Sequence, residues 1–134
     1  MVRRILLVAL FALITFASEI AHAEIFAAGP VYGGNLAELT GGVVTCRVFN
    51  AGLVPVVING TVIFTNVNSA LALISNSCTI PIGPAQYCAF AAISPGNFAY
   101  SCRLNVTGLE TNVRGVAEVR GTTGRILNAM PLQK

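Results

Sequence analysis

Apolar and polar residues alternate along several short stretches of the chain, most clearly in residues 98–106 and 113–119. In the first stretch every second residue, from Phe98 to Val106, is aromatic, aliphatic or cysteine, and the residues between them are small or polar. The second stretch alternates in the same way and places Arg114 and Arg120 on one face. A period of two residues is typical of a β-strand with one buried face, so both stretches are predicted to be strands.

Further strands are predicted where runs rich in Val, Ile, Thr and Phe end at Gly, Pro or Asn. Asn59-Gly60 interrupts one such run, and we interpret the pair as a β-bulge because the arms of a hairpin there would be very short. Residues 24–42 are rich in Gly and Ala and predict an irregular lead-in or an edge strand. The predicted strands are 43–50, 54–66, 71–77, 79–83, 87–93, 98–106, 113–119 and 125–129. A set of about seven strands at this spacing predicts an all-β, antiparallel sandwich or small barrel.

The N-terminus has the composition of a secretory signal peptide. A short basic head precedes an apolar run over residues 5–16, and an Ala-x-Ala sequence ends at Ala23. The apolar run is shorter than the roughly 18 residues that a membrane span needs. We therefore expect a cleaved signal peptide over residues 1–23, an exported protein that is periplasmic or extracellular, and no membrane span after cleavage. Residues 43–134 then make one domain, because that length suits a single small core.

Four cysteines follow the predicted signal peptide: Cys46, Cys78, Cys88 and Cys102. An even number of cysteines in an oxidising compartment predicts two disulfides, for which three pairings exist. In the strands that hold Cys46 and Cys102 an arginine follows the cysteine, so cysteine and arginine face opposite sides. We expect Cys46–Cys102 to cross the core and Cys78–Cys88 to clamp a short Pro-containing loop. A zinc site is disfavoured because no CxxC pair and no remaining histidine exist.

Two short motifs resemble a known family. Residues 50–56 read Asn-Ala-Gly-Leu-Val-Pro-Val, and Cys78 is followed by Pro84 and Cys88. These segments are similar to the immunoglobulin-like repeats of the Hydin type, which also occur in bacterial exported proteins. The resemblance covers about a third of the chain and implies an Ig-like β-sandwich that binds or scaffolds without catalytic residues. The order Gly83-Pro84 departs from the family's Pro-Gly, and the family's later Phe-x-Pro element is absent, so the topology stays open.

The amino-acid composition limits the kinds of catalytic and binding site that the protein can contain. The only histidine, His22, lies in the predicted signal peptide, and the chain contains no Asp and no Trp. A hydrolase triad needs a base, usually His, held by a carboxylate, so we expect no enzyme and no catalytic, cofactor or metal site. The net charge of +3 is too small for a nucleic-acid partner, which calls for a dense basic stripe. We interpret the carboxylates after residue 23 as solvated surface charges; they are Glu24, Glu38, Glu110 and Glu118.

Three arginines near the C-terminus, Arg114, Arg120 and Arg125, are candidate contacts for a partner with an anionic surface. Such arginines also discourage pairing between sheet edges, which is the simpler interpretation. Three scattered tyrosines can stack on sugars, although they are also typical of cores and rims. They are Tyr32, Tyr87 and Tyr100.

The sequence therefore predicts a non-enzymatic binding module with an unknown protein or glycan partner. The alternative is a structural subunit of a cell-surface assembly. In that case the apolar residues 25–32 would pair with the sheet edge of a neighbouring copy, and the low charge would permit self-association.

Overall fold

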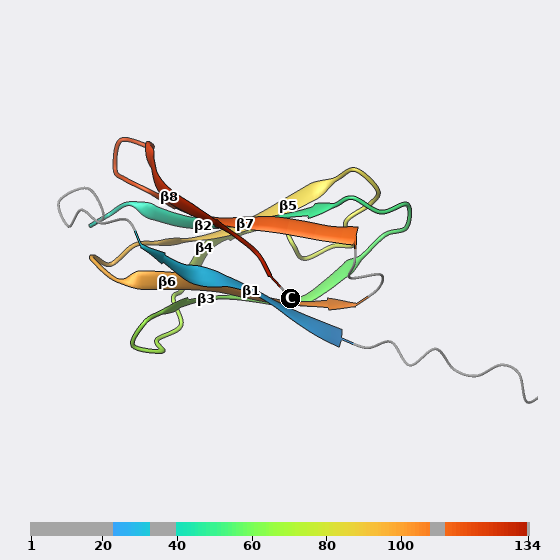
Figure 1. Ribbon diagram of the computed structural model, residues 1–134, viewed down its shortest axis with the longest axis horizontal. Coiled ribbons are helices and arrows are strands. Elements are labelled where there is room, and N and C mark those ends of the chain that lie inside the picture. The colour runs from blue at the N-terminus through green and yellow to red at the C-terminus, as the bar shows by residue number, and fades with distance from the viewer. Residues whose placement is uncertain (1–22, 33–39, 108–111, 134) are drawn as a thin grey trace, which may run out of the picture.

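The computed structural model describes residues 23–32, 40–107 and 112–133, which form β-strands and no α-helix (Figure 1). The strands are β1 (Ala23–Tyr32), β2 (Val43–Asn50), β3 (Val57–Thr65), β4 (Leu73–Asn76), β5 (Tyr87–Ile93), β6 (Ala99–Thr107), β7 (Val113–Arg120) and β8 (Ile126–Pro131). All pairings between these strands are antiparallel. The predicted all-β, antiparallel class is therefore confirmed. Within the described residues no helix has the length and hydrophobicity needed to cross a membrane.

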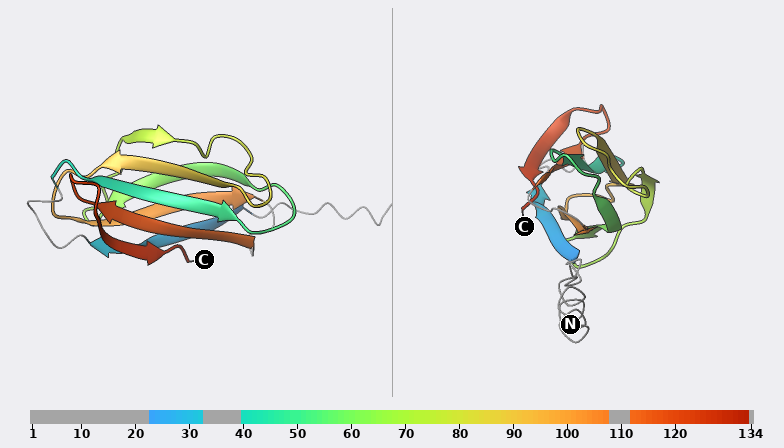
Figure 2. Two further views of the ribbon diagram at one scale, coloured as in Figure 1. Left: turned by 90° about the horizontal axis from the view of Figure 1, so that it is seen from above. Right: turned by 90° about the vertical axis from the view of Figure 1, so that its right-hand side faces the viewer.

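The strands form two sheets that lie one above the other (Figures 1 and 2). The smaller sheet has the strand order β1-β6-β3, and the larger sheet has the order β4-β5-β2-β7-β8. Consecutive strands change sheet between β1 and β2, β2 and β3, β3 and β4, β5 and β6, and β6 and β7. The core is therefore built from segments that are far apart in the sequence.

Alternation along the strands decides which side chains enter this core. In β2 the residues Val44, Cys46 and Val48 are buried, and those between them are partly exposed. In β6 every second residue from Tyr100 to Val106 is buried. The period of two predicted for residues 98–106 is confirmed, β2 alternates in the same way, and the two buried faces meet between the sheets.

A disulfide between Cys46 of β2 and Cys102 of β6 joins the two sheets, as predicted. The Cα atoms are 6.1 Å apart, both residues are fully buried, and they lie 56 positions apart in the sequence. The arginines that follow each cysteine, Arg47 and Arg103, are at least partly exposed on the outer faces. Closing a loop of this size stabilises the folded state by roughly 4 kcal/mol in the chain-entropy model.

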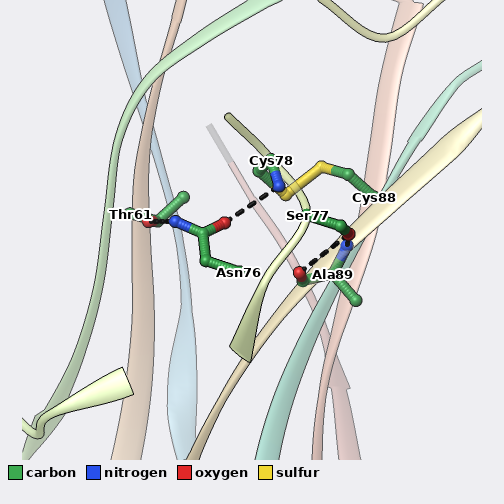
Figure 3. The surroundings of a disulfide bond; sticks show 6 residues. All are labelled: Thr61, Asn76, Ser77, Cys78, Cys88 and Ala89. Atoms are coloured by element: carbon green, nitrogen blue, oxygen red, sulfur yellow. Dashed lines mark hydrogen bonds between the residues drawn. A yellow bond between two sulfur atoms is a disulfide. The ribbon is translucent and has the colours of Figure 1, made fainter. Parts of the chain in front are cut away.

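The second predicted disulfide, Cys78–Cys88, is also present and ties the segment after β4 to β5 (Figure 3). The oxygen and the nitrogen of the Asn76 side-chain amide both make hydrogen bonds next to this disulfide. Its Oδ1 accepts a hydrogen bond of 2.9 Å from the Cys78 N–H, and its Nδ2 donates one of 2.9 Å to Thr61 Oγ1 of β3 (Figure 3). The disulfide and this amide together hold the short edge strand β4 against β5 and β3.

Asn50 ends β2 and shapes the loop that follows. Its buried Nδ2 donates to the carbonyl oxygens of Val54 and Ile82 at 2.8 and 2.9 Å, and its Oδ1 accepts from the Gly52 N–H at 2.9 Å. These bonds hold residues 51–56 in a loop. The strand predicted to begin at residue 54 therefore begins at Val57.

Two other sequence predictions have different outcomes. The bulge predicted at Asn59-Gly60 is confirmed, because the register between β3 and β6 shifts there. The predicted strand 79–83 is wrong. Only Ile82 makes a bridge, to Val56, because Pro81 has no N–H to donate.

Residues 23–32 form an edge strand, β1, which is longer than an irregular lead-in would allow. Phe26, Ala28 and Val31 point into the core and are buried. The register against β6 shifts between Ala28 and Val31, at Gly29-Pro30. The predicted signal peptide otherwise lies outside the described residues, and cleavage after Ala23 would leave β1 almost complete.

A hydrogen-bonded corner connects β5 to β6. The hydroxyl group of Tyr100, which is fully buried, donates to the Gly96 carbonyl oxygen and lies 2.7 Å from Ser94 Oγ. Ser94 Oγ also lies 3.2 Å from the Gly96 carbonyl oxygen, and its one proton can be donated either to that oxygen or to the Tyr100 hydroxyl oxygen. The corner satisfies the polar atoms of Tyr100 and Ser94 inside the core, where unpaired groups would be costly.

Candidate functional site

The outer face of the five-stranded sheet brings two aromatic and two basic side chains together. Phe49 of β2 pairs with Tyr87 of β5 on one side and with Arg114 of β7 on the other. One step along the same face, Arg47 pairs with Val116 of β7. All of these positions have the parity opposite to that of the buried cysteine of β2, so their side chains point outward.

A groove of about 470 Å³ lies among these side chains. Tyr87 is 68% exposed and Phe49 is 40% exposed, so two aromatic rings from neighbouring strands are accessible side by side. On the same face of β5, Ala89 pairs with Arg47. The residues that line the groove are Arg47, Val48, Phe49, Tyr87, Arg114, Gly115 and Val116.

A carboxylate held by two arginines lies next to the groove on the same face. Glu118 Oε2 accepts hydrogen bonds from Arg120 Nε at 3.1 Å and Arg120 Nη2 at 2.8 Å, and Arg47 Nε lies 3.5 Å away. The Glu118 side chain is only 11% exposed. The interpretation of Glu118 as a solvated surface charge is therefore wrong, because the arginines cover it. Glu38 and Glu110 lie outside the described residues.

One carboxylate shared between two guanidinium groups leaves this face with excess positive charge. Arg114 adds to it at the far end of the groove, where its Nη1 donates to the Val113 carbonyl oxygen at 2.9 Å. Among the lining residues there is no acidic side chain. The electrostatic character of the groove therefore favours an anionic ligand.

The three arginines singled out in the sequence do not form one cluster. Arg114 and Arg120 are on the same face of β7, but six residues of strand separate them by roughly 20 Å. Arg125 is exposed in the turn between β7 and β8. The arginine that the fold brings to Arg114 is instead Arg47, from the neighbouring strand.

The three tyrosines predicted as possible contacts lie in three different parts of the structure. Tyr100 belongs to the core, Tyr32 is at the end of β1, and only Tyr87 lines the groove. Phe49 is not among the contact residues that the sequence predicts. Its parity in β2 marks it as outward-facing, but only the pairing of β2 with β5 shows that it lies beside Tyr87.

The side chains that line the groove are of few chemical types. Its lining holds guanidinium, aromatic and aliphatic side chains, with no paired nucleophile and base. Within the described residues no three side chains of the metal-ligating types gather, and all four cysteines are in disulfides. What the arrangement can do chemically is to contact a flat apolar surface and an anionic group at the same time.

No protein-family model matches the chain, and no curated protein or solved structure matches it significantly. The resemblance to Hydin-type repeats stays a prediction. The functional assignment therefore depends on the geometry of the groove and of the two sheets.

Proposed function

We propose that this protein is an exported, non-enzymatic binding module and that the groove on the outer face of the five-stranded sheet is its binding surface. The observation that carries the proposal is the exposed pair Phe49 and Tyr87, flanked by Arg47 and Arg114. Exposed aromatic and arginine side chains are the types most enriched at recognition surfaces. The two disulfides are consistent with an oxidising location, which supports export to the periplasm or the cell exterior.

An Ig-like assignment of the sandwich supports the same function. Tyr100 lies two residues before Cys102, its hydroxyl group bonds the Gly96 carbonyl oxygen upstream, and Cys102 joins the sheets through Cys46. A tyrosine corner and an inter-sheet disulfide of this kind are hallmarks of Ig domains. Domains of this architecture commonly bind through exposed strands and loops while the core stays fixed.

The groove indicates a partner of mixed chemistry. A flat apolar face, such as one side of a sugar ring or an aliphatic side chain, would pack against Tyr87 and Phe49. A carboxylate or phosphate beside it would bind Arg47 or Arg114, because guanidinium groups bind such anions in a bidentate way. An acidic glycan and an acidic protein segment both meet these conditions.

A titration followed by NMR tests the proposal. The isotope-labelled chain without residues 1–23 would receive uronic-acid oligosaccharides, their neutral counterparts and an acidic peptide. We expect an anionic probe to shift the amide signals of residues 47–49, 87 and 114–116. Added salt should weaken that binding.

Variants make the titration decisive. Tyr87→Ala should reduce affinity at least tenfold, because it removes the most exposed ring of the groove. The matched control is Ile80→Ser, which removes a side chain that is equally exposed but lies outside the groove. Equal binding by both variants, or shifts that map elsewhere, would refute the assignment of the groove.

The alternative function, a structural subunit that pairs through sheet edges, draws support from a different observation. β1 lies at an edge of the three-stranded sheet and supplies part of the core.

A further inference from the structure

The position beside β6 must be filled for the core to close. β1 fills it by pairing from Ala23 opposite Thr107 to Tyr32 opposite Ala99. Its inward residues are 5% exposed at Phe26, 2% at Ala28 and fully buried at Val31. Without β1, the inner side chains at this edge of the sandwich would contact water. The protein therefore needs a strand here, but nothing in the pairing requires that the strand come from the same copy.

β1 is joined to the rest of the protein by non-covalent contacts alone. Neither disulfide includes β1, whereas Cys46–Cys102 joins β2 to β6 and Cys78–Cys88 joins the segment after β4 to β5. On the side away from β6, Ala27 exchanges two backbone hydrogen bonds with Gln133, at 2.9 and 2.8 Å. Asn128 Nδ2 of β8 also donates to the Tyr32 carbonyl oxygen, at 2.8 Å. No covalent bond therefore ties β1 to the copy on which it packs, apart from the chain itself.

The sequence of β1 weakens its pairing in the middle. Pro30 has no N–H to donate, and the register against β6 shifts between Ala28 and Val31. Gly29 has a positive φ of 134°, and a Cβ there would lie 2.8 Å from the Tyr100 carbonyl oxygen. β1 thus binds as two short segments joined by an irregular step, and each segment can detach at a smaller cost than a continuous strand.

We propose that β1 is an exchangeable strand: β1 of one copy takes the position beside β6 of a second copy of this chain. The contacts are the same within one copy and between two, so the balance depends on chain concentration and on the connection between β1 and β2. That connection, residues 33–42, contains two Gly-Gly pairs. Reciprocal exchange gives a closed dimer, and exchange passed from copy to copy gives a chain. This inference is independent of the groove.

Cross-linking between β1 and β6 tests the exchange on the chain that lacks residues 1–23. Ala27 and Arg103 are register partners, and both are exposed on the outer face. Cysteines placed opposite each other on antiparallel strands are close enough to form a disulfide. One preparation carries Ala27→Cys and the other carries Arg103→Cys. The two preparations are mixed at high concentration, incubated at a temperature below the thermal unfolding transition, and then gently oxidised.

We expect the mixture to yield a disulfide between residues 27 and 103 of different copies, seen by mass spectrometry and non-reducing gels. A chain with both substitutions should link within itself at low concentration and between copies at high concentration. The control partner for Ala27→Cys is Ser75→Cys, which is exposed on β4 of the other sheet.

Three outcomes would overturn the proposal. Linking to residue 75 as often as to residue 103 would show random collision. A mixture that stays unlinked, while the double variant links only within its own chain, would show that β1 does not exchange. A double variant that never links would show that β1 does not pair with β6 in this register. Tyr87→Ala should leave the exchange unchanged, which separates this test from that of the groove.

Discussion

Gly115 of β7 lies where a side chain has no room, and replacing it by alanine tests how the C-terminal segment packs. An added Cβ would lie 2.0 Å from Leu132 Cδ1 and 2.7 Å from the Arg47 carbonyl oxygen. The partly buried Leu132 can change rotamer. The Arg47 carbonyl belongs to the backbone of β2, which pairs with β7, and can move only if that pairing is disturbed. The clash thus has one part that the protein can relieve and one part that it cannot.

The expected cost follows from these two parts. Overpacking in a well-packed core costs about 1–3 kcal/mol. Moving Leu132 away from the core removes part of the roughly 1.5–3 kcal/mol that burial of a whole leucine contributes. We therefore expect Gly115→Ala to lower the free energy of unfolding by about 2–4 kcal/mol. The measurement is urea denaturation with both disulfides intact, followed by far-UV circular dichroism.

Two further variants show whether the reasoning is correct. Gly60→Ala is the matched control, since its added Cβ would meet only Asn105 Nδ2 at an ordinary 3.6 Å. Its effect should stay within about 0.5 kcal/mol. Leu132→Ala should cost less in the Gly115→Ala background than in the unaltered chain, because it removes one of the clashing atoms. Additive effects, or a Gly115→Ala cost no larger than that of the control, would refute the assigned clash.

Two other substitutions test polar groups inside and outside the core. Tyr100→Phe removes the hydroxyl group that contacts Ser94 and Gly96, and it should lower the free energy of unfolding by about 1–3 kcal/mol in urea denaturation. The control Tyr32→Phe, at an exposed position, should be neutral. Equal effects of the two substitutions would contradict the role of the corner. Glu118→Gln removes the carboxylate that the two arginines share and should cost less than about 1 kcal/mol, because both arginines are about a third exposed or more. The difference between this variant and the unaltered chain should shrink in 1 M salt, and a large loss that salt does not change would show a role other than ion pairing.

Local patterns in the sequence predict much of the fold. β2 and β5 have the predicted bounds, 43–50 and 87–93, because Gly, Pro and Asn flank runs of β-forming residues. The disulfide pairing was predictable because Cys46 and Cys102 share a parity with buried neighbours. The strand expected at 79–83 does not form, because Pro81 has no N–H for a ladder and the segment makes one long-range bridge, from Ile82 to Val56. The place of β1 beside β6 was not predictable, since strand order depends on how the whole chain packs.

The candidate site was less predictable than the fold. Alternation correctly placed Arg114 and Arg120 on one face of β7, but it could not show that Arg47 and Phe49 of β2 lie beside that face. The burial of Glu118 has the same origin, because one of its covering arginines comes from the neighbouring strand. The periodicity of a sequence predicts whether a side chain points inward or outward. To predict a binding surface, one must also know which strands lie next to each other.

Under the proposed export, with the N-terminus crossing first, the pairing of the first strand with the sixth sets an order of events. β1 would reach the destination compartment first, and its partner β6 would follow about 80 residues later, which corresponds to roughly 4–16 s at the speed of synthesis. During that interval the apolar side of β1 has no place to dock within its own chain. At high concentration, β1 would dock more often on a neighbour whose β6 edge is still open, and a slow supply of chains would favour closure of each chain on itself.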